Sequence, residues 1–156
     1  MIKQIYTPAK KSRTPFRKLP SSKKGTAGEK IVSTWFNSRG YLVYKPSKTR
    51  SSHPIDFFAY HFESGSIAAF DVKTYPCRSV YGDQGIDLPD FQTYCRIAEK
   101  MPVSVVFVDS ERRSVYSLEF SPGNIAAGRI EGEKVYFDLQ LTKVLFTLLW
   151  ADIEKL

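Results

Sequence analysis

The sequence predicts an α/β domain in which a mixed sheet of about five strands is flanked by helices. One observation behind this prediction is the alternation of apolar patterns, because helical spacing in some segments gives way to strand spacing in others. The expected order is helix, three strands, helix, two strands. The second observation is a near-continuous apolar run at 103–109, which is typical of a central strand covered on both faces.

The first expected element is a helix at 26–39. Its apolar residues recur at helical spacing, namely Ile31, Val32, Trp35 and Phe36. Gly40 is a residue type that commonly ends a helix. A strand is expected at 41–45, and a serine-rich loop at 46–54 follows it.

The next expected elements form a hairpin. Two apolar segments, 55–60 and 67–73, are separated by a turn sequence at 63–65, and such a pair is typical of two adjacent antiparallel strands. A long loop is expected at 74–87, which contains Gly82 and Gly85.

A second helix is expected at 88–100, opened by Asp87 and Pro89. The apolar run at 103–109 and a segment at 115–120 are expected to be strands. Beyond them, a short strand is expected at 135–138 and a helix at 141–156. Four leucines would face inward on that helix: Leu141, Leu145, Leu148 and Leu149.

Length and composition predict one globular domain, 26–156, in a chain of 156 residues. A hydrophobic content of 42% is too high for wholesale disorder. We expect a cytosolic protein, because the chain has no apolar run long enough for a membrane span and its N-terminus lacks the apolar core of a secretory signal. Cys77 and Cys95 are the two cysteines, and their spacing favours neither a disulfide framework nor a zinc site.

The net charge of +7 is concentrated at the N-terminus, where residues 1–28 contain eight of the 23 Lys and Arg residues and no acid. We expect residues 1–25 to form a flexible basic arm that binds a polyanion, with DNA phosphates as the leading candidate. A solubilising tail or a localisation signal is the alternative. The residues expected to contact DNA from this segment are Lys10, Lys11, Arg13, Arg17, Lys18, Lys23 and Lys24.

The pattern with most chemical information is Pro54-Ile55-Asp56 followed by Asp71-Val72-Lys73. Residues two apart on a strand share a face, so Asp71 and Lys73 project together. Asp56 is expected on the neighbouring strand, and two carboxylates there would repel each other. A divalent cation between them removes this difficulty, and oxygen ligands suit Mg²⁺ or Mn²⁺. The alternative is an ordinary Asp71–Lys73 ion pair on a solvated strand.

Glu29 is the third candidate acid. It lies three and seven residues before Val32 and Phe36, on the inward stripe of the first helix. The carboxylate could reach a metal or a water bound near it. The spacing of Thr26 and Glu29 equally matches a capping box, in which Glu29 would bind a backbone N–H group.

Together, Glu29, Pro54-Ile55-Asp56 and Asp71-Val72-Lys73 resemble the PD-(D/E)xK nucleases, which have a restriction-endonuclease-like core. Within that superfamily the chain looks most like RecU-type and archaeal Holliday-junction resolvases. The segment Leu88-Pro89-Asp90-Phe91-Gln92 is similar to a helix start of the RecU-like group.

This resemblance implies a Mg²⁺-dependent endonuclease in which Asp56, Asp71 and Glu29 are metal ligands and Lys73 is the catalytic lysine. Gln92 resembles a glutamine that many members place near the site, and the alternative is an ordinary amide on the helix surface. We further expect DNA contacts from loop residues that flank the site in sequence, Lys48, Arg50 and Arg78.

The implied substrate is a four-way DNA junction, and its two symmetric cuts call for a homodimer. One alternative is a nuclease of the same fold that acts on another DNA substrate, such as a nicking, flap or restriction-type enzyme. A non-catalytic nucleic-acid-binding module is the other. That module would depend on neither metal nor acid pair.

Overall fold

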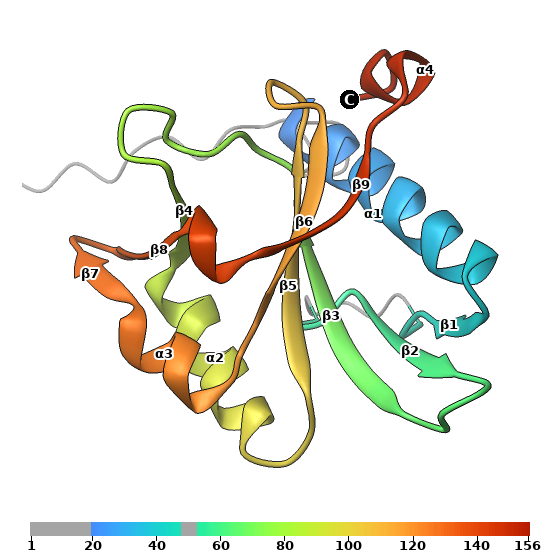
Figure 1. The fold of residues 1–156 in the computed structure, drawn as a ribbon, viewed down its shortest axis with the longest axis horizontal. Helices are drawn as coiled ribbons and strands as arrows, with labels where there is room; N and C mark the ends of the chain where they lie inside the picture. Colours follow the sequence, from blue (N-terminus) through green and yellow to red (C-terminus); the bar gives the residue numbers. More distant parts are fainter. Residues whose placement is uncertain (1–19, 48–52) are drawn as a thin grey trace, which may run out of the picture.

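A computed structural model of the chain describes residues 20–47 and 53–156 as one α/β domain (Figure 1). The elements in chain order are α1 (Pro20–Ser38), β1 (Tyr41–Tyr44), β2 (Phe57–His61), β3 (Ile67–Lys73), β4 (Asp83–Asp87), α2 (Leu88–Ala98), β5 (Val103–Asp109), β6 (Ser114–Glu119), α3 (Pro122–Ala127), β7 (Arg129–Glu131), β8 (Lys134–Asp138), the short 3₁₀ helix η2 (Leu139–Leu141), β9 (Lys143–Thr147) and α4 (Trp150–Ile153).

The main sheet has six strands in the order β1-β2-β3-β5-β6-β9. The β3–β5 pair is parallel and the other pairs are antiparallel, so the predicted mixed sheet is confirmed with one strand more than expected. The predicted hairpin is confirmed as β2 and β3, in which Phe57 lies opposite Phe70. The parallel pair requires a crossover, and α2 lies within it.

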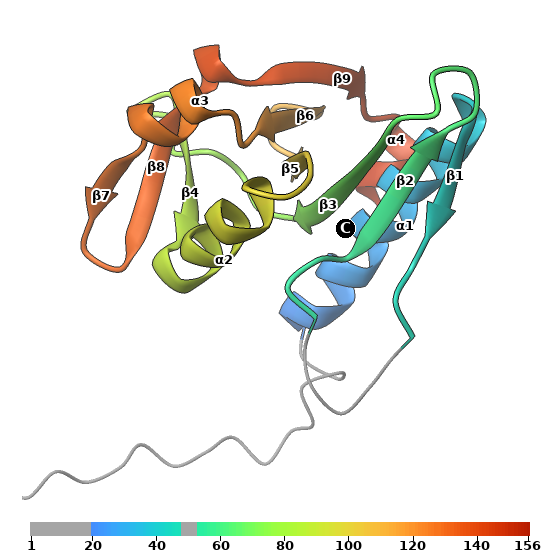
Figure 2. The same ribbon diagram turned by 90° about the horizontal axis from the view of Figure 1, so that it is seen from below.

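The two long helices cover opposite faces of the main sheet (Figure 2). Phe70 and Val72 of β3 pack in a cluster with residues of α1, whereas Ala69 packs in a second cluster with Tyr94 of α2. Successive side chains of a strand point to opposite faces. Asp71 therefore lies on the face that α2 covers.

A smaller sheet, β4-β8-β7, lies beside α2 (Figure 1). Here the prediction of a continuous loop at 74–87 is wrong, since Asp83–Asp87 forms strand β4 and pairs with β8. Gly85 does not mark a turn: it lies under the ring of Tyr136, where an added Cβ atom would come within 2.7 Å of a ring carbon. Gly82 does turn the chain, with a φ of 62°.

The C-terminal segment also differs from its prediction, because 141–156 is not one helix. It forms the edge strand β9, which pairs with β6 across a register shift, and then the short helix α4. Leu148 is fully buried, while Leu149 is 69% exposed. The leucines expected on one helical face are therefore divided between the core and the surface.

At the other end, helix α1 extends back to Pro20, so residues 20–25 are helical and the helix prediction of 26–39 was too short. The rest of the expected arm, residues 1–19, lies outside the described residues. Proline fits the first turn of a helix, where its missing N–H group is not needed. No helix in the described ranges is both long enough and apolar enough to span a membrane.

Candidate active site

Asp56 is fixed next to β3 by two hydrogen bonds. Its backbone N–H donates to the carbonyl of Phe70 at 3.0 Å, and its Oδ2 atom accepts from the backbone N–H of Val72 at 2.7 Å. The carboxylate thus continues the ladder between β2 and β3 in place of a main-chain carbonyl. Because Val72 follows Asp71 directly, this arrangement brings the two acids together at the end of the hairpin.

Asp71 is 6% exposed and lies beneath α2. The hydroxyl of Tyr94 donates a hydrogen bond to its Oδ2 atom at 2.6 Å. Tyr94 itself is 1% exposed. The cover of α2 and the buried Tyr94 ring together place the Asp71 carboxyl in surroundings with little water.

Lys73 has the expected position, on the same face of β3 as Asp71. Its Nζ atom lies 3.1 Å from Oδ2 of Asp71 and 2.6 Å from Oδ2 of Asp90, a residue in the first turn of α2. The lysine therefore bridges the β3 acid and the α2 acid.

The surroundings of the two strand acids disfavour their charged forms. Burial, together with the nearby charge of Asp56, raises the pKa of Asp71 from 3.8 to about 7. Burial also raises the pKa of Asp56. The hydrogen bond from Val72 opposes this shift, while the charge of Glu29 adds to it. The two carboxyls thus form a close pair that favours a shared proton or a bound cation.

Lys73 remains a cation in this arrangement. Burial alone would lower its pKa, but the charge of Asp71 and the hydrogen bond to Asp90 outweigh burial and raise the pKa. A lysine in this state can balance negative charge, and it is a poor base.

Glu29 lies on α1, near the point where this helix passes close to the end of β3. An added Cβ atom on Gly28 would overlap the Thr74 hydroxyl oxygen, directly after β3, so any larger residue would force Thr74 or the helix to shift. Glu29 is half-buried, and its charge acts on Asp56. The Thr74 hydroxyl is buried and makes no hydrogen bond within the described part of the protein.

The acids of this site suit a hard divalent cation in chemistry, since buried carboxylate oxygens are the ligands that Mg²⁺ and Mn²⁺ prefer. Across residues 20–47 and 53–156, no three His, Cys, Asp or Glu side chains are grouped closely enough to hold a metal ion. The described geometry therefore provides a pair of candidate ligands, Asp56 and Asp71, with Glu29 near Asp56.

Gln92 does not face this pair. It is exposed on α2 and lies two residues after Asp90 and two before Tyr94, which places it about 200° around the helix from both. Asp90 and Tyr94 are the site residues that sequence reasoning missed. Their spacing of four residues puts them on one helix face, a signal that was available, but Asp90 resembles an ordinary acid of a first helical turn.

Arg78 is already bound within the small-sheet region. It forms ion pairs with Asp83 at 2.6 Å and with Glu131 at 2.8 Å, and its guanidinium group stacks over the ring of Tyr136. Arg129 contacts the same Asp83 carboxylate at 2.8 Å. These contacts occupy the charged group that was expected to contact DNA.

The other predicted DNA contacts fall in two groups. Lys23 and Lys24 are exposed near the start of α1. The remaining ones lie outside the described residues: Lys10, Lys11, Arg13, Arg17, Lys18, Lys48 and Arg50.

Comparisons with known proteins identify the fold. No family model matches the chain, and no curated protein matches it by sequence. A solved structure does: the Holliday junction resolvase Hjc of the archaeal hyperthermophile Archaeoglobus fulgidus superposes with a TM-score of 0.57. The similarity covers 78% of this chain and 92% of Hjc, at 11% sequence identity. The predicted restriction-endonuclease-like fold is thereby confirmed: the chain has the fold of an archaeal Holliday junction resolvase.

Proposed function

We propose that this chain is a metal-dependent DNA endonuclease. Its active site, formed by Asp56, Asp71 and Lys73, would hydrolyse phosphodiester bonds. The observation that carries the proposal is the buried, mutually repelling carboxyl pair with a charged lysine beside it. A strand that needed only to pack would gain nothing from two acids at this position, whereas a cation bound between them offsets both burial and repulsion.

In this proposal Asp56 and Asp71 hold Mg²⁺, for which Mn²⁺ could substitute, and Glu29 adds a carboxylate from α1. A metal held there would supply Lewis-acid chemistry: it would lower the pKa of a water and stabilise the charge that develops on the phosphate. Lys73 stays protonated and faces the same centre, so we assign it charge balance and orientation rather than proton abstraction.

The proposed substrate is a four-way DNA junction. Its support is the fold shared with Hjc, together with a positively charged N-terminal segment that can bind phosphates without reading bases. A nicking, flap or restriction-type enzyme would use the same acids, so the substrate must be tested separately from the chemistry. A non-catalytic binding module is disfavoured because inward-facing acids repel phosphate and would serve no purpose in it.

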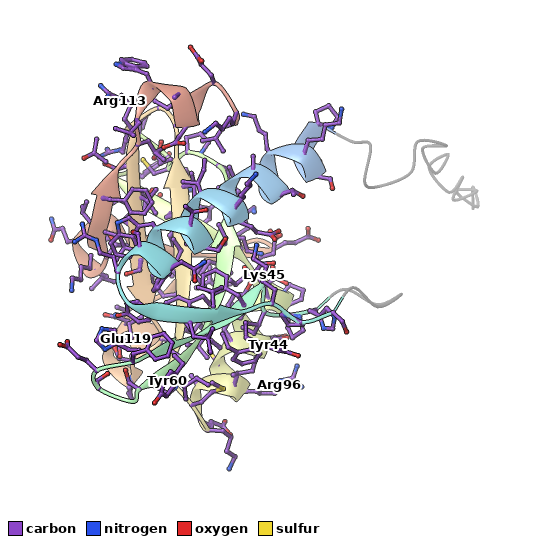
Figure 3. The ribbon with its side chains drawn as sticks, turned by 90° about the vertical axis from the view of Figure 1, so that its right-hand side faces the viewer. Tyr44, Lys45, Tyr60, Arg96, Arg113 and Glu119 are labelled. Carbon is purple, nitrogen blue, oxygen red and sulfur yellow. The ribbon has the colours of Figure 1, made fainter. Side chains whose placement is uncertain are left out.

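We also propose that the active form is a homodimer, since two symmetric cuts require two sites. A candidate dimer surface lies on the uncovered part of the main sheet, where Leu42 is opposite Tyr60 and Tyr60 is opposite Ile67. This edge face exposes large apolar side chains over 38–65% of their surface, among them Tyr44 and Tyr60, which are labelled in Figure 3. Sedimentation should show a dimer for the wild type and a shift toward monomer for Tyr60→Lys.

The function is tested by incubating labelled DNA with Mg²⁺, using a four-way junction, a linear duplex, a flap and a single strand. Paired symmetric cuts confined to the junction, absent without metal and in Asp71→Ala, are the expected result. Cleavage that requires Asp71 but prefers another substrate would retain the nuclease and exclude the resolvase. DNA binding without cleavage, unchanged in Asp71→Ala, would contradict both.

A further inference from the structure

We infer that Asp90 is a positioning residue: it holds the ammonium group of Lys73 toward α2 and so keeps the Asp71 carboxylate available for a divalent cation. The inference rests on the proposed nuclease function and assigns a role to a residue of α2 that touches neither DNA nor metal in that proposal.

The distances favour Asp90 as the principal partner of Lys73. The Nζ atom lies 2.6 Å from Oδ2 of Asp90, within strong hydrogen-bonding distance, but 3.1 Å from Oδ2 of Asp71. The Lys73 side chain is 20% exposed, so little water competes for this contact. The Asp90 side chain is 42% exposed and can adjust from the solvent side.

Asp71 has two tasks that compete for its charge. Without Asp90, Asp71 would be the one acid bound by Lys73 in the described contacts, and the ammonium group would neutralise the carboxylate that the cation needs. Asp90 adds a second negative charge to the centre, so that lysine and cation need not share one carboxylate. Tyr94 and Lys73 both contact Oδ2 of Asp71, which leaves Oδ1 outside these contacts.

The competing explanation is that Asp90 is an ordinary stabilising acid in the first turn of α2. Asp87 provides a matched control for it. That residue lies at the same helix end and forms a more exposed ion pair of the same length, 2.6 Å, with Lys134 rather than with Lys73. Replacing either acid removes one charge near the helix start, but only Asp90→Ala removes the 2.6 Å contact of Lys73 with α2.

The first measurement is independent of catalysis. Urea unfolding without metal is compared for the wild type, Asp90→Ala, Lys73→Met and the double variant. If the two residues interact as described, the double variant's change in the unfolding equilibrium constant differs from the product of the single changes by about threefold or more. A simple product would overturn the inference.

The second measurement is single-turnover DNA cleavage against Mg²⁺ concentration. Asp90→Ala should cut about 10- to 100-fold more slowly and need several-fold more Mg²⁺ for half-maximal rate. DNA affinity should stay within about twofold, Asp90→Glu should recover part of the rate, and Asp87→Ala should match the wild type.

The outcomes separate the two proposals. Cleavage and Mg²⁺ dependence in Asp90→Ala that match the wild type would overturn the positioning role while the nuclease stands. Absence of metal-dependent cleavage in the wild type would overturn the proposed function, and coupling retained in the unfolding experiment would then reduce Asp90 to a stabilising ion pair.

Discussion

At the scale of single residues, the central property of the site is the cost of ionising Asp71. The carboxyl is buried beside Asp56, and its pKa of about 7 means that the folded protein binds a proton there more tightly than the unfolded chain does. Stability and the proposed function therefore make opposite demands on this residue: packing favours the protonated acid, and the proposed metal would require the carboxylate.

This conflict predicts that the contribution of Asp71 to stability falls as pH rises, the opposite of an ordinary paired carboxylate. Between the ordinary pKa of 3.8 and the raised value of about 7, the folded state holds the additional proton. The contribution of Asp71 to stability is full below this window and is lost as pH rises through it, by at most about 1.4 kcal/mol per pH unit.

Asp71→Asn should remove this slope and, without metal, be more stable than the wild type at pH 8. Urea unfolding at pH 5 and pH 8 checks this. A variant less stable than the wild type at pH 8 would contradict it.

The sequence predicts that Asp56, Asp71 and Lys73 lie together, and the structure brings them together, because strand alternation and a hairpin follow from short-range patterns. It could not place Asp90 against Lys73, because that contact depends on how α2 docks after the crossover. No local pattern encodes that docking, and Asp90 resembles an ordinary acid of a first helical turn.

At the scale of elements, the approach of α1 to β3 places Glu29 near the acid pair. The contact depends on Gly28, whose missing side chain leaves room for Thr74. A glycine inside a helix costs about 1 kcal/mol relative to alanine, so a packing requirement has to offset that cost.

The effect of Gly28→Ala on stability should consequently depend on the residue at position 74. In the wild-type background the added methyl group overlaps the Thr74 hydroxyl, and overpacking of this kind costs about 1–3 kcal/mol. In a Thr74→Ala background the overlap with the hydroxyl is gone, and the better helix propensity should make Gly28→Ala neutral or stabilising. Thermal unfolding of the four proteins measures this, and equal costs in both backgrounds would refute the packing explanation.

Two elements escaped prediction for different physical reasons. The sequence predicts a loop at β4 because Gly82 and Gly85 are typical of turns, but Gly85 makes room for the ring of Tyr136. The sequence predicts a helix at β9 because the leucines of this segment fit a helical spacing, but pairing with β6 overrides that spacing.

The small sheet makes a separate prediction for Arg78. Since this arginine binds the fully buried Asp83 and also Glu131, Arg78→Ala should lower the unfolding midpoint clearly and change DNA affinity by less than about twofold. Lys23→Ala, which replaces an exposed lysine of α1, is the control. It should lower DNA affinity and leave the unfolding midpoint unchanged. A large loss of DNA affinity in Arg78→Ala without loss of stability would restore it as a DNA contact.

At the scale of the whole molecule, the charge distribution predicts how DNA affinity responds to salt. Deleting residues 1–19 removes six Lys and Arg residues, and each phosphate that the protein no longer neutralises should reduce the slope of log K against log salt by about 0.9. The truncated protein should bind DNA more weakly with a slope smaller by at most about five. Its cleavage rate at saturating DNA should remain. An unchanged slope would assign the DNA contacts to the folded domain.

The central claim is that Asp56 and Asp71 form a metal-dependent nuclease centre. It is tested most directly by the single-turnover cleavage rate of labelled junction DNA, with Mg²⁺ and with chelator, for the wild type, Asp56→Asn and the control Asp87→Asn. We predict cleavage that requires Mg²⁺, falls at least about 100-fold in Asp56→Asn and is retained in Asp87→Asn. Cleavage that persists in Asp56→Asn or with chelator would contradict the claim.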